Sequence, residues 1–479
     1  MPSLTWTNFS SSRQPEIIRT NTNRVLNAKD VHASLVTSLN NLSFNDRNTI
    51  QEEIHGVRSI APEETPEMVE QALLHLEVEL GEIPSFMRTG YERAVALGSD
   101  YIESKDVRIK YLRADLFDSK KAADRLTRHL NLLYKYFGDI ALLRPLCFED
   151  LTAEEQELYR EGNSQLLPSR DRSGRLVHFH EQYGAKSVPP MSVRMRIVLY
   201  DAGAMSEDEV TQKKGLVGVY LIRPDSASFH ADPHERAEYA EVLKCHPTRI
   251  SSVHLVLPAG PMYPFIKAVV MLTGEPELRL RTNCYAGFTM ETRYKLLCYG
   301  IQVDEFPLTS GGLLKTKVNN QYLSVRRAFE KGRMDGLDTS GWILHPHIHD
   351  VLFSQGGNAR HQGNVSFQHI MELKMDAYNS KRSRKEGKLI RGDMIRQVKE
   401  KGGRFLELNR QGGHWVEIEN PDALHSRINT QMYDHNRRLV ARLQQQFFES
   451  DTTKFLGGTN NHKKQKVDNN GRLCGGGCL

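Results

Sequence analysis

The sequence predicts an α/β fold at the centre of the chain, with a helical segment before it and a small basic α+β domain after it. Three observations give this prediction. Apolar residues recur at helical spacing from residue 62 to 162, short β-type runs alternate with amphipathic helices from 166 to 312, and a helix, helix, hairpin, helix order follows from 345 to 448. Strands that alternate with helices indicate βαβ units, and therefore a mainly parallel sheet.

Charge is distributed unevenly along the 479 residues. The chain has 64 Lys and Arg against 59 Asp and Glu, and residues 343–448 hold 17 of the basic and 11 of the acidic side chains. The positive charge is therefore concentrated in that range. We expect an acidic partner, either nucleic acid or an anionic lipid surface, to bind near the C-terminal end.

Composition sets the expected domain boundaries. Residues 1–60 and 449–479 are polar and predict disordered tails. Between them we expect a helical subdomain over 61–164, a ligand-binding α/β domain over 165–330 and a basic domain over 343–448. The stretch "KKQKV" in the second tail resembles a nuclear signal, and a solvated run of charge is the alternative that we favour.

Several functional classes are not expected. The apolar run "AVVML" over 268–272 is too short to span a bilayer. The six cysteines lack the spacing of a metal site, and we expect them to be reduced. No Gly-rich nucleotide motif and no G-x-S-x-G elbow follows a predicted strand, so we expect no cofactor and no enzyme. We expect a cytoplasmic protein that associates peripherally with membranes, with the nucleus as the second location.

The helical segment contains clear start and stop signals. Asp118 or Ser119 is available to cap a helix that Gly138 ends. Thr152 and Glu155 have the spacing of a capping box before a second helix. The first of these helices has one apolar stripe, which consists of Ala122, Ala123, Leu126, Leu130, Leu133, Tyr134 and Phe137. Its many charges are expected to face water.

Four strands are expected in the α/β part, over 175–179, 215–222, 250–257 and 277–285. Helical patterns over 235–244, 262–272 and 290–300 follow the last three. In the basic domain, helices are expected over 367–378 and 388–403, and "RFLEL" and "HWVEI" flank a hairpin turn. Asn420 and Pro421 then have the pattern of an N-cap and a first helical residue.

The central part of the chain resembles the CRAL-TRIO (Sec14-like) lipid-transfer family. The helical stretch "RIKYLRADLFDSKKAADRL" is similar to the lead-in of that family, and "LLPSRDRSGRLVHF" and "HPTRISSVHLVLPAG" are similar to two of its strand motifs. The ending "YGIQVDEFPLTSGG" resembles its closing Leu-Pro-x-x-x-Gly-Gly. The resemblance covers residues 100–312 in order. It implies a CRAL-TRIO-like domain, with a helical N-terminal subdomain and a pocket that holds one lipid or similar apolar molecule.

The resemblance implies that alternate residues of the strands form the floor of this pocket. Arg279 and Arg281 would share one strand face and reach a phosphate headgroup. A solvated strand edge is the alternative for this arginine pair. Thr248 stands where phosphoinositide-binding members have a Glu, which argues against phosphatidylinositol. The expected floor residues are Val219, Leu221, Val253, Leu255, Leu257, Leu278 and Leu280.

The helix expected over 262–272 is the candidate gate of the pocket. Lys267 is its only charge, and the resemblance places the family's gate helix here. A helix that is apolar on nearly all sides is either buried in a core or available to a membrane, and the sequence leaves both readings open. For a gate, Phe265 and Val269 lie on one face and would enter lipid. Ile266 and Val270 complete the apolar surface.

The basic domain resembles an uncharacterised family, seen mainly in microalgal proteins, through "DVLFSQGG", "HQGNVSFQ" and "GGRFLEL". Its helix order is also reminiscent of winged-helix DNA readers. A dense basic stretch is the expected binding surface for the acidic partner, a membrane or a nucleic acid, and it consists of Lys381, Arg382, Arg384, Lys385, Lys388 and Arg391. A solvated helix face is the third reading.

The stretch "HPHIHD" invites a metal-site hypothesis. It places His345, His347 and His349 beside Asp350. No second cluster of His or acidic residues at a known spacing completes such a site. We therefore expect a linker here and no bound metal.

Overall fold

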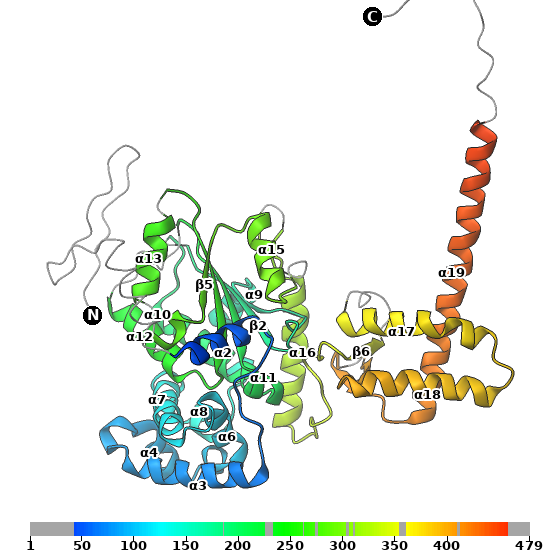
Figure 1. Ribbon diagram of the computed structural model, residues 1–479. Helices are drawn as coiled ribbons and strands as arrows, with labels where there is room; N and C mark the ends of the chain where they lie inside the picture. The colour runs from blue at the N-terminus through cyan, green and yellow to red at the C-terminus, as the bar shows by residue number, and fades with distance from the viewer. Residues whose placement is uncertain are drawn as a thin grey trace, which may run out of the picture.

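A computed structural model describes residues 43–457 except 185, 226–232, 262, 274–275, 303–305, 310–311, 354–360 and 410–411. The chain is a mixed α/β protein with a mainly parallel central sheet (Figure 1). Helices of the first part lie below the sheet in this view, and a smaller α+β unit lies beside it. The predicted α/β class and mainly parallel sheet are confirmed.

The chain between residues 43 and 60 is part of the fold, so the prediction of a disordered tail over 1–60 is wrong for this segment. Helix α2 (Phe44–Ile54) packs on the sheet, and Glu53 and Ile54 are buried. The Glu53 carboxylate pairs with Arg249 and Arg281. The sequence signal was weak because α2 is polar overall and its buried acid acts through partners that are distant in sequence.

The helical subdomain packs into one core together with residues from three helices of the α/β part. The longest helix, α7 (Ser119–Phe137), begins at Asp118, whose side chain accepts from Lys121 N–H, and ends at Gly138, as predicted. Its predicted stripe is buried except for Tyr134 and Phe137, which remain partly exposed. The other helices are α3 (Pro66–Glu82), η1 (Ser85–Met87), α4 (Thr89–Ala96), α5 (Asp100–Glu103), α6 (Lys105–Ala114) and α8 (Ile140–Leu143).

Two short helices lead from the subdomain into the sheet. They are η2 (Phe148–Asp150) and α9 (Ala153–Arg160). The predicted capping box at the start of α9 is confirmed, because Thr152 accepts from Glu155 N–H and Glu155 accepts from Thr152 N–H. This N-terminus is therefore determined by local sequence.

The central sheet has five strands in the order β1-β2-β3-β4-β5. Strand β1 (Ser164–Leu166) is antiparallel to β2 (Leu176–Glu181), and β2, β3 (Leu216–Leu221), β4 (Ile250–Leu257) and β5 (Thr282–Ala286) run parallel. All carboxyl ends of the parallel strands therefore meet at one edge of the sheet. Ligands of open α/β sheets bind at this edge.

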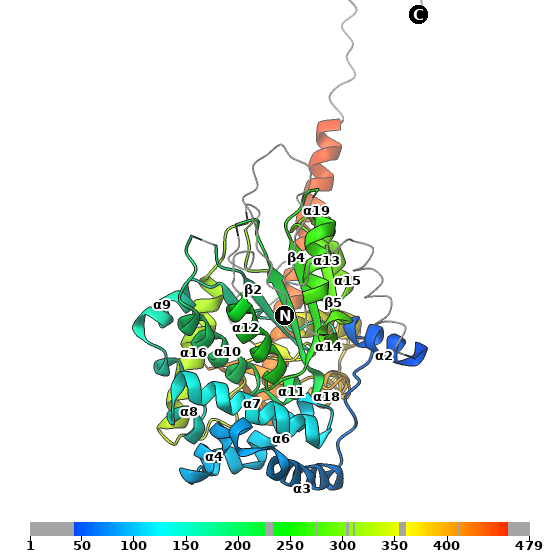
Figure 2. The same ribbon diagram turned by 90° about the vertical axis from the view of Figure 1, so that its left-hand side faces the viewer.

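Helices cover both faces of the sheet (Figures 1 and 2). One face carries α10 (Met191–Met205), α12 (Pro233–Cys245) and α13 (Tyr263–Thr273). The other carries α15 (Met290–Cys298) and α2, where His55 stacks on Tyr299 with a ring centroid distance of 4.5 Å. Helices α11 (Glu209–Lys214), α14 (Pro276–Arg279) and α16 (Lys317–Met334) complete this part.

The fourth predicted strand begins too early. Residues 276–279 form α14, and β5 begins only at Thr282. Alternating Leu and Arg over 277–281 gave a strand pattern, but the chain makes one helical turn from Pro276. Arg279 and Arg281 therefore do not share a strand face, and the predicted arrangement of this pair on one strand is wrong.

The C-terminal unit is a three-stranded sheet packed on helices. Strand β6 (Val351–Phe353) runs parallel to β7 (Phe405–Leu408), which pairs antiparallel with β8 (Trp415–Glu417). Helices α17 (Gln362–Asn379) and α18 (Arg384–Glu400) form a hairpin between β6 and β7. Its core includes Phe353, Phe367, Met394, Phe405 and Ile428.

The final helix, α19 (Pro421–Gly457), extends beyond the unit that it completes (Figure 1). Asn420 caps it by accepting from Ala423 N–H, and Pro421 is its first residue, as predicted. The prediction of a disordered tail over 449–479 is wrong for residues 449–457, which continue this helix. Within the part of the chain that the structure describes, no helix combines the length and the apolar character of a membrane span.

The segment that joins the two parts is held from both sides. The ring of Trp342 stacks on His414 of the hairpin at a centroid distance of 3.7 Å, and it lies 6.1 Å from the ring of Phe329 in α16. Ile343 forms a β-bridge with Trp415. The connection is therefore packed against both α16 and the β7–β8 hairpin.

Candidate functional site

A cavity of about 230 Å³ lies at the carboxyl edge of the parallel sheet. It is built by the ends of β3 and β4 and by the loops that follow β3, β4 and β5. Leu221 and Leu257 line it from the strands, and Leu308 closes it from the segment after α15. This position follows from the parallel topology, because four strand ends and their loops converge there.

The cavity wall combines apolar surface with two arginines. Phe288 and Leu308 supply apolar surface, and the guanidinium of Arg293 lies over the Phe288 ring, 5.0 Å from its centroid. Arg223 pairs with Glu181 and donates to the Gly312 carbonyl. Within the described residues, the Arg293 guanidinium makes no ion pair, so it is available to an anionic group of a ligand.

Helix α13 begins four residues after Ala259, which lines the cavity. It packs against β4 and β5, and the Tyr263 hydroxyl donates to the Cys284 carbonyl at 2.9 Å. Phe265, Ile266 and Val270 are only partly buried. None of the α13 side chains that the structure describes is fully buried, although the helix is apolar. This exposure favours the gate reading over the core-helix reading.

The predicted ligand-binding residues separate into distinct locations. Leu221 and Leu257 line the cavity. Val219 is fully buried in the core cluster that also includes Leu296 of α15, and it does not line the cavity, so its assignment to the pocket floor stays a prediction. Leu255 is in register with Tyr220, the residue after Val219, so Leu255 and Val219 point to opposite faces of the sheet. Leu255 is partly buried.

Other predicted ligand-binding residues do not line the cavity, or their side chains are not described by the structure. Leu278, Arg279, Leu280 and Arg281 precede β5 and therefore lie at the amino edge of the sheet. Arg281 also forms an ion pair with Glu53, and it donates a hydrogen bond to the Ser251 carbonyl. The side chain of Val269 falls outside the described residues, so its place on the gate stays a prediction.

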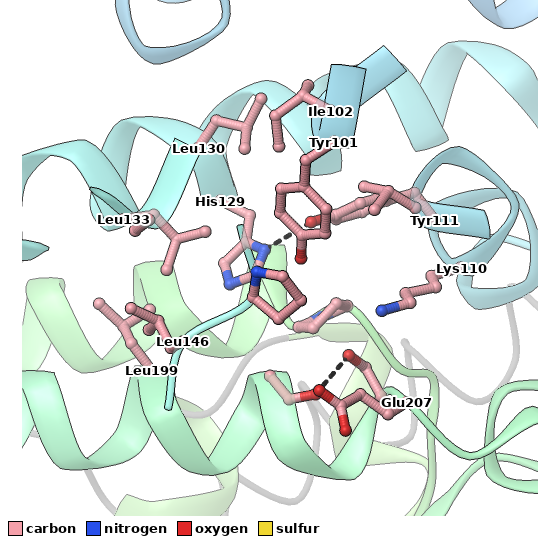
Figure 3. A pocket seen from close by; sticks show the side chains of 16 residues that line it. Tyr101, Ile102, Lys110, Tyr111, His129, Leu130, Leu133, Leu146, Leu199 and Glu207 are labelled. Atoms are coloured by element: carbon pink, nitrogen blue, oxygen red, sulfur yellow. Dashed lines mark hydrogen bonds between the residues drawn. The ribbon is translucent and has the colours of Figure 1, made fainter. Parts of the chain in front are cut away.

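A second, smaller cavity of about 40 Å³ lies between the helical subdomain and α10 (Figure 3). Lys110 extends into it above Glu207, and the Tyr111 hydroxyl shares a 2.7 Å hydrogen bond with Nδ1 of His129. Burial lowers the pKa of His129 to about 3, so the ring is neutral at pH 7. The volume suits a few water molecules but not a lipid.

Glu207, at the rim of the smaller cavity, is part of a buried ion cluster. Burial raises its pKa, but Arg326 and Arg333 outweigh that effect and bring the pKa of Glu207 to about 2. Arg326 also pairs with Glu330 at 2.5 Å. The cluster connects α16 to the chain after α10, and we assign it a structural role.

A Ser, a His and an Asp meet near β1, but they do not have the arrangement of a catalytic triad. The Ser164 hydroxyl contacts His178 Nε2 at 2.7 Å and donates to Asp201 at 2.5 Å. In a triad the His lies between the Ser and the Asp, whereas here the Ser lies between the other two. The Tyr159 hydroxyl also donates to Asp201. The network joins α9, β1, β2 and α10.

Asp201 gives this network a measurable pH dependence. Burial raises the pKa of Asp201 to about 6, against the hydrogen bonds from Ser164 and Tyr159 that lower it. Because this folded-state pKa is above the unfolded value near 3.9, the contribution of Asp201 to stability is full below pH ~4 and is lost as the pH rises through about 6. The loss is on the order of 3 kcal/mol at most.

We therefore expect Asp201→Asn to remove one component of the pH profile. The amide stays neutral, so the free energy of unfolding of the wild type should fall relative to that of the variant between pH 4 and 7. Urea denaturation at several pH values measures the free energies of unfolding of the wild type and of the variant. A wild-type minus variant difference that stays constant over this range would contradict the raised pKa.

The histidine stretch, residues 345–350, lies in the segment that connects α16 to β6. His345 packs on Tyr322 of α16 with ring centroids 5.3 Å apart, and the His347 N–H donates to Asp350. The buried Asp350 carboxylate also accepts from the backbone and the side chain of Arg404. Among the described residues no cluster of His, Cys, Asp and Glu could hold a metal ion.

The predicted basic stretch lies at the turn between α17 and α18. Arg382, Arg384 and Lys385 are exposed, and Lys388 pairs with Asp422 at 3.2 Å. The Lys381 ammonium lies 3.4 Å from the centroid of the Tyr378 ring. Arg391 donates to Asn429 at 3.0 Å. The structure thus brings these side chains to one end of the hairpin.

Sequence reasoning missed several lining residues of the cavity. Arg223, Phe288 and Arg293 each follow a strand by two to seven positions, in three different loops or helix starts. The signal that could have found them is their place after parallel strands, because such positions converge at one edge. The prediction concentrated on strand residues, most of which are core.

Residues 350–427 match the model of a family described as a domain of unknown function, DUF6824. No curated protein matches the chain. Among solved structures, the crystal structure of Sfh5, a Sec14-family protein, is similar at 12% identity with a TM-score of 0.30, over 47% of this chain and 82% of that chain.

Proposed function

We propose that the protein binds a lipid-like amphipathic molecule at the carboxyl edge of its sheet. The observation that carries this proposal is the composition of the cavity wall, which has apolar side chains on the strand ends and, at one side, the Arg293 guanidinium, which forms no ion pair with a described residue. Leu221, Leu257 and Phe288 would contact the apolar part, and Arg293 would contact an anionic group. The role is binding, with no chemical step.

The size of the cavity requires a movement when a whole lipid enters. Its volume of about 230 Å³ is below the roughly 300–1,000 Å³ of ordinary ligand pockets. Helix α13 is the element that we expect to move, because it begins four residues after the cavity-lining Ala259 and its described side chains are at most partly buried. Displacing it costs less apolar burial than displacing a core helix such as α7.

An apolar helix that moves outward also needs an apolar environment for the side chains that it exposes. Each CH₂ group that leaves a bilayer for water costs about 0.8 kcal/mol, so exchange of the ligand is favourable only where α13 meets the membrane. Phe265 and Ile266 would enter the interface, while Lys267 would remain with the headgroups. Transfer of the ligand between membranes is part of this proposal.

Filling the cavity should reduce ligand uptake strongly. Ala259 is exposed and lines the cavity, so Ala259→Trp places bulk there without disturbing the core. We expect uptake of a fluorescent phospholipid from vesicles by the full chain to fall about tenfold or more, since a loss of ~1.4 kcal/mol is tenfold in affinity. Native mass spectrometry of the purified wild type should show one bound lipid.

Two further variants sharpen this test. Ala96→Trp places the same bulk on an exposed position of α4 and should leave uptake unchanged. Arg293→Gln should reduce uptake of anionic lipid about tenfold while sparing neutral lipid, because one charge-assisted contact is lost. Wild-type protein that neither retains nor takes up lipid would refute the proposal, and equal uptake by the Ala259→Trp variant would refute the site.

A further inference from the structure

The tip of the α17–α18 hairpin carries positive charge that no described residue neutralises. Arg382, Arg384 and Lys385 are exposed, and none of the three side chains forms an ion pair with a described residue. The carboxylate nearest in sequence, Glu386, instead accepts from the backbone N–H of Arg382. Uncompensated charge of one sign at an exposed tip attracts an anionic partner.

The neighbouring cations are fixed by contacts within the domain and support the tip. Lys381 lies over the Tyr378 ring and donates to the Tyr378 carbonyl at 3.0 Å. Lys388 pairs with Asp422, and Arg391 with Asn429. These contacts hold the turn against α19, so the three uncompensated side chains project from a packed base.

An apolar side chain lies among these cations. Leu389 is 68% exposed, and it follows Lys385 by four residues, so both lie on one face of α18. An exposed leucine makes no favourable contact with the phosphate backbone of a nucleic acid. At a membrane it is buried at the boundary between the headgroups and the acyl chains. The combination of cations with an exposed leucine fits a lipid surface.

The hairpin geometry argues against the DNA-reading alternative. In helix-turn-helix readers the two helices cross at a large angle, so that the second helix can lie in the major groove. Here α17 and α18 run antiparallel and side by side (Figure 1), and they pack along their lengths. Groove insertion of α18 would be blocked by α17.

We propose that the tip of the α17–α18 hairpin docks the protein on an anionic membrane surface. This inference rests on the proposed function, because docking would bring a lipid-binding domain to the membrane from which it draws its ligand. The docking surface consists of Arg382, Arg384, Lys385 and Leu389. It belongs to the domain of unknown function and is separate from the cavity.

The test is flotation of the full chain with phosphatidylcholine vesicles, with or without phosphatidylserine. Wild-type protein should bind only the anionic vesicles, and added salt should weaken binding. The double variant Arg384→Gln, Lys385→Gln should bind about tenfold or more weakly. The matched control is Lys399→Gln, Lys401→Gln, which removes two exposed charges at the other end of α18 and should bind like the wild type.

Leu389→Ser keeps the charge and should still reduce binding several-fold, which a purely electrostatic contact would not show. Equal binding by the test and control variants would overturn the proposal. So would salt-sensitive binding to duplex DNA that Arg384→Gln, Lys385→Gln removes while vesicle binding is absent. Docking without lipid uptake would refute the proposed function alone, and uptake without docking would refute this inference alone.

Discussion

Replacing Glu53 by Ala should destabilise the protein by about 3–5 kcal/mol. The Glu53 carboxylate is 1% exposed and pairs with Arg249 and Arg281, whose side chains are 8% and 13% exposed. Alanine leaves these two buried cations close together without an anion. Urea denaturation followed by far-ultraviolet circular dichroism measures the loss.

Two comparisons isolate the role of Glu53 and of its helix. Gln51→Ala changes an exposed residue of α2 and should leave stability within about 0.5 kcal/mol of the wild type. A chain that begins at residue 61 lacks α2 and should be less stable than one that begins at residue 43. Equal stability of these two chains would show that α2 does not belong to the folded unit.

Adding one methyl group at Gly403 should disrupt the C-terminal unit. A Cβ atom there would lie 2.2 Å from the His349 carbonyl oxygen and 3.0 Å from Val398 Cγ1. A backbone oxygen can move only if the turn before β6 separates from β7, so we expect Gly403→Ala to cost about 3 kcal/mol or more. Hydrogen exchange of residues 362–400 should accelerate.

The same unit offers a control with the opposite sign. Gly392 lies within α18, and a Cβ atom there would meet no atom within 4 Å. Gly392→Ala should therefore stabilise the helix by about 0.5–1 kcal/mol through propensity alone. If Gly403→Ala were tolerated as well as Gly392→Ala, the close approach of β7 to residue 349 would be contradicted.

The sequence predicted those elements that are determined locally. The caps at Asp118 and Thr152, strand β4 over 250–257 and the start of α19 at Pro421 all depend on residues within a few positions. Their apolar spacing and capping chemistry act over one or two turns. Local sequence therefore contains the required signal.

The errors concern contacts between distant parts of the chain. Arg281 finds its partner 228 residues away in α2, and no local pattern contains that pairing. The alternation of apolar and polar residues over 277–281 is typical of a strand, but residues 276–279 form a helical turn that begins at Pro276. The cavity was located only in part, because Arg223, Phe288 and Arg293 come together through sheet topology and not through spacing.

The packing of the connection between the two parts has a spectroscopic consequence. The chain contains three tryptophans, of which Trp6 is outside the described residues, and the other two, Trp342 and Trp415, both lie at this junction. Their emission would report on the ring stack with His414 and on the β-bridge at Ile343. It would not report directly on the cavity or on the helical subdomain. In a Trp6→Phe variant, a fluorescence change upon addition of vesicles would therefore signal a rearrangement between α16 and the β7–β8 hairpin, without any introduced label.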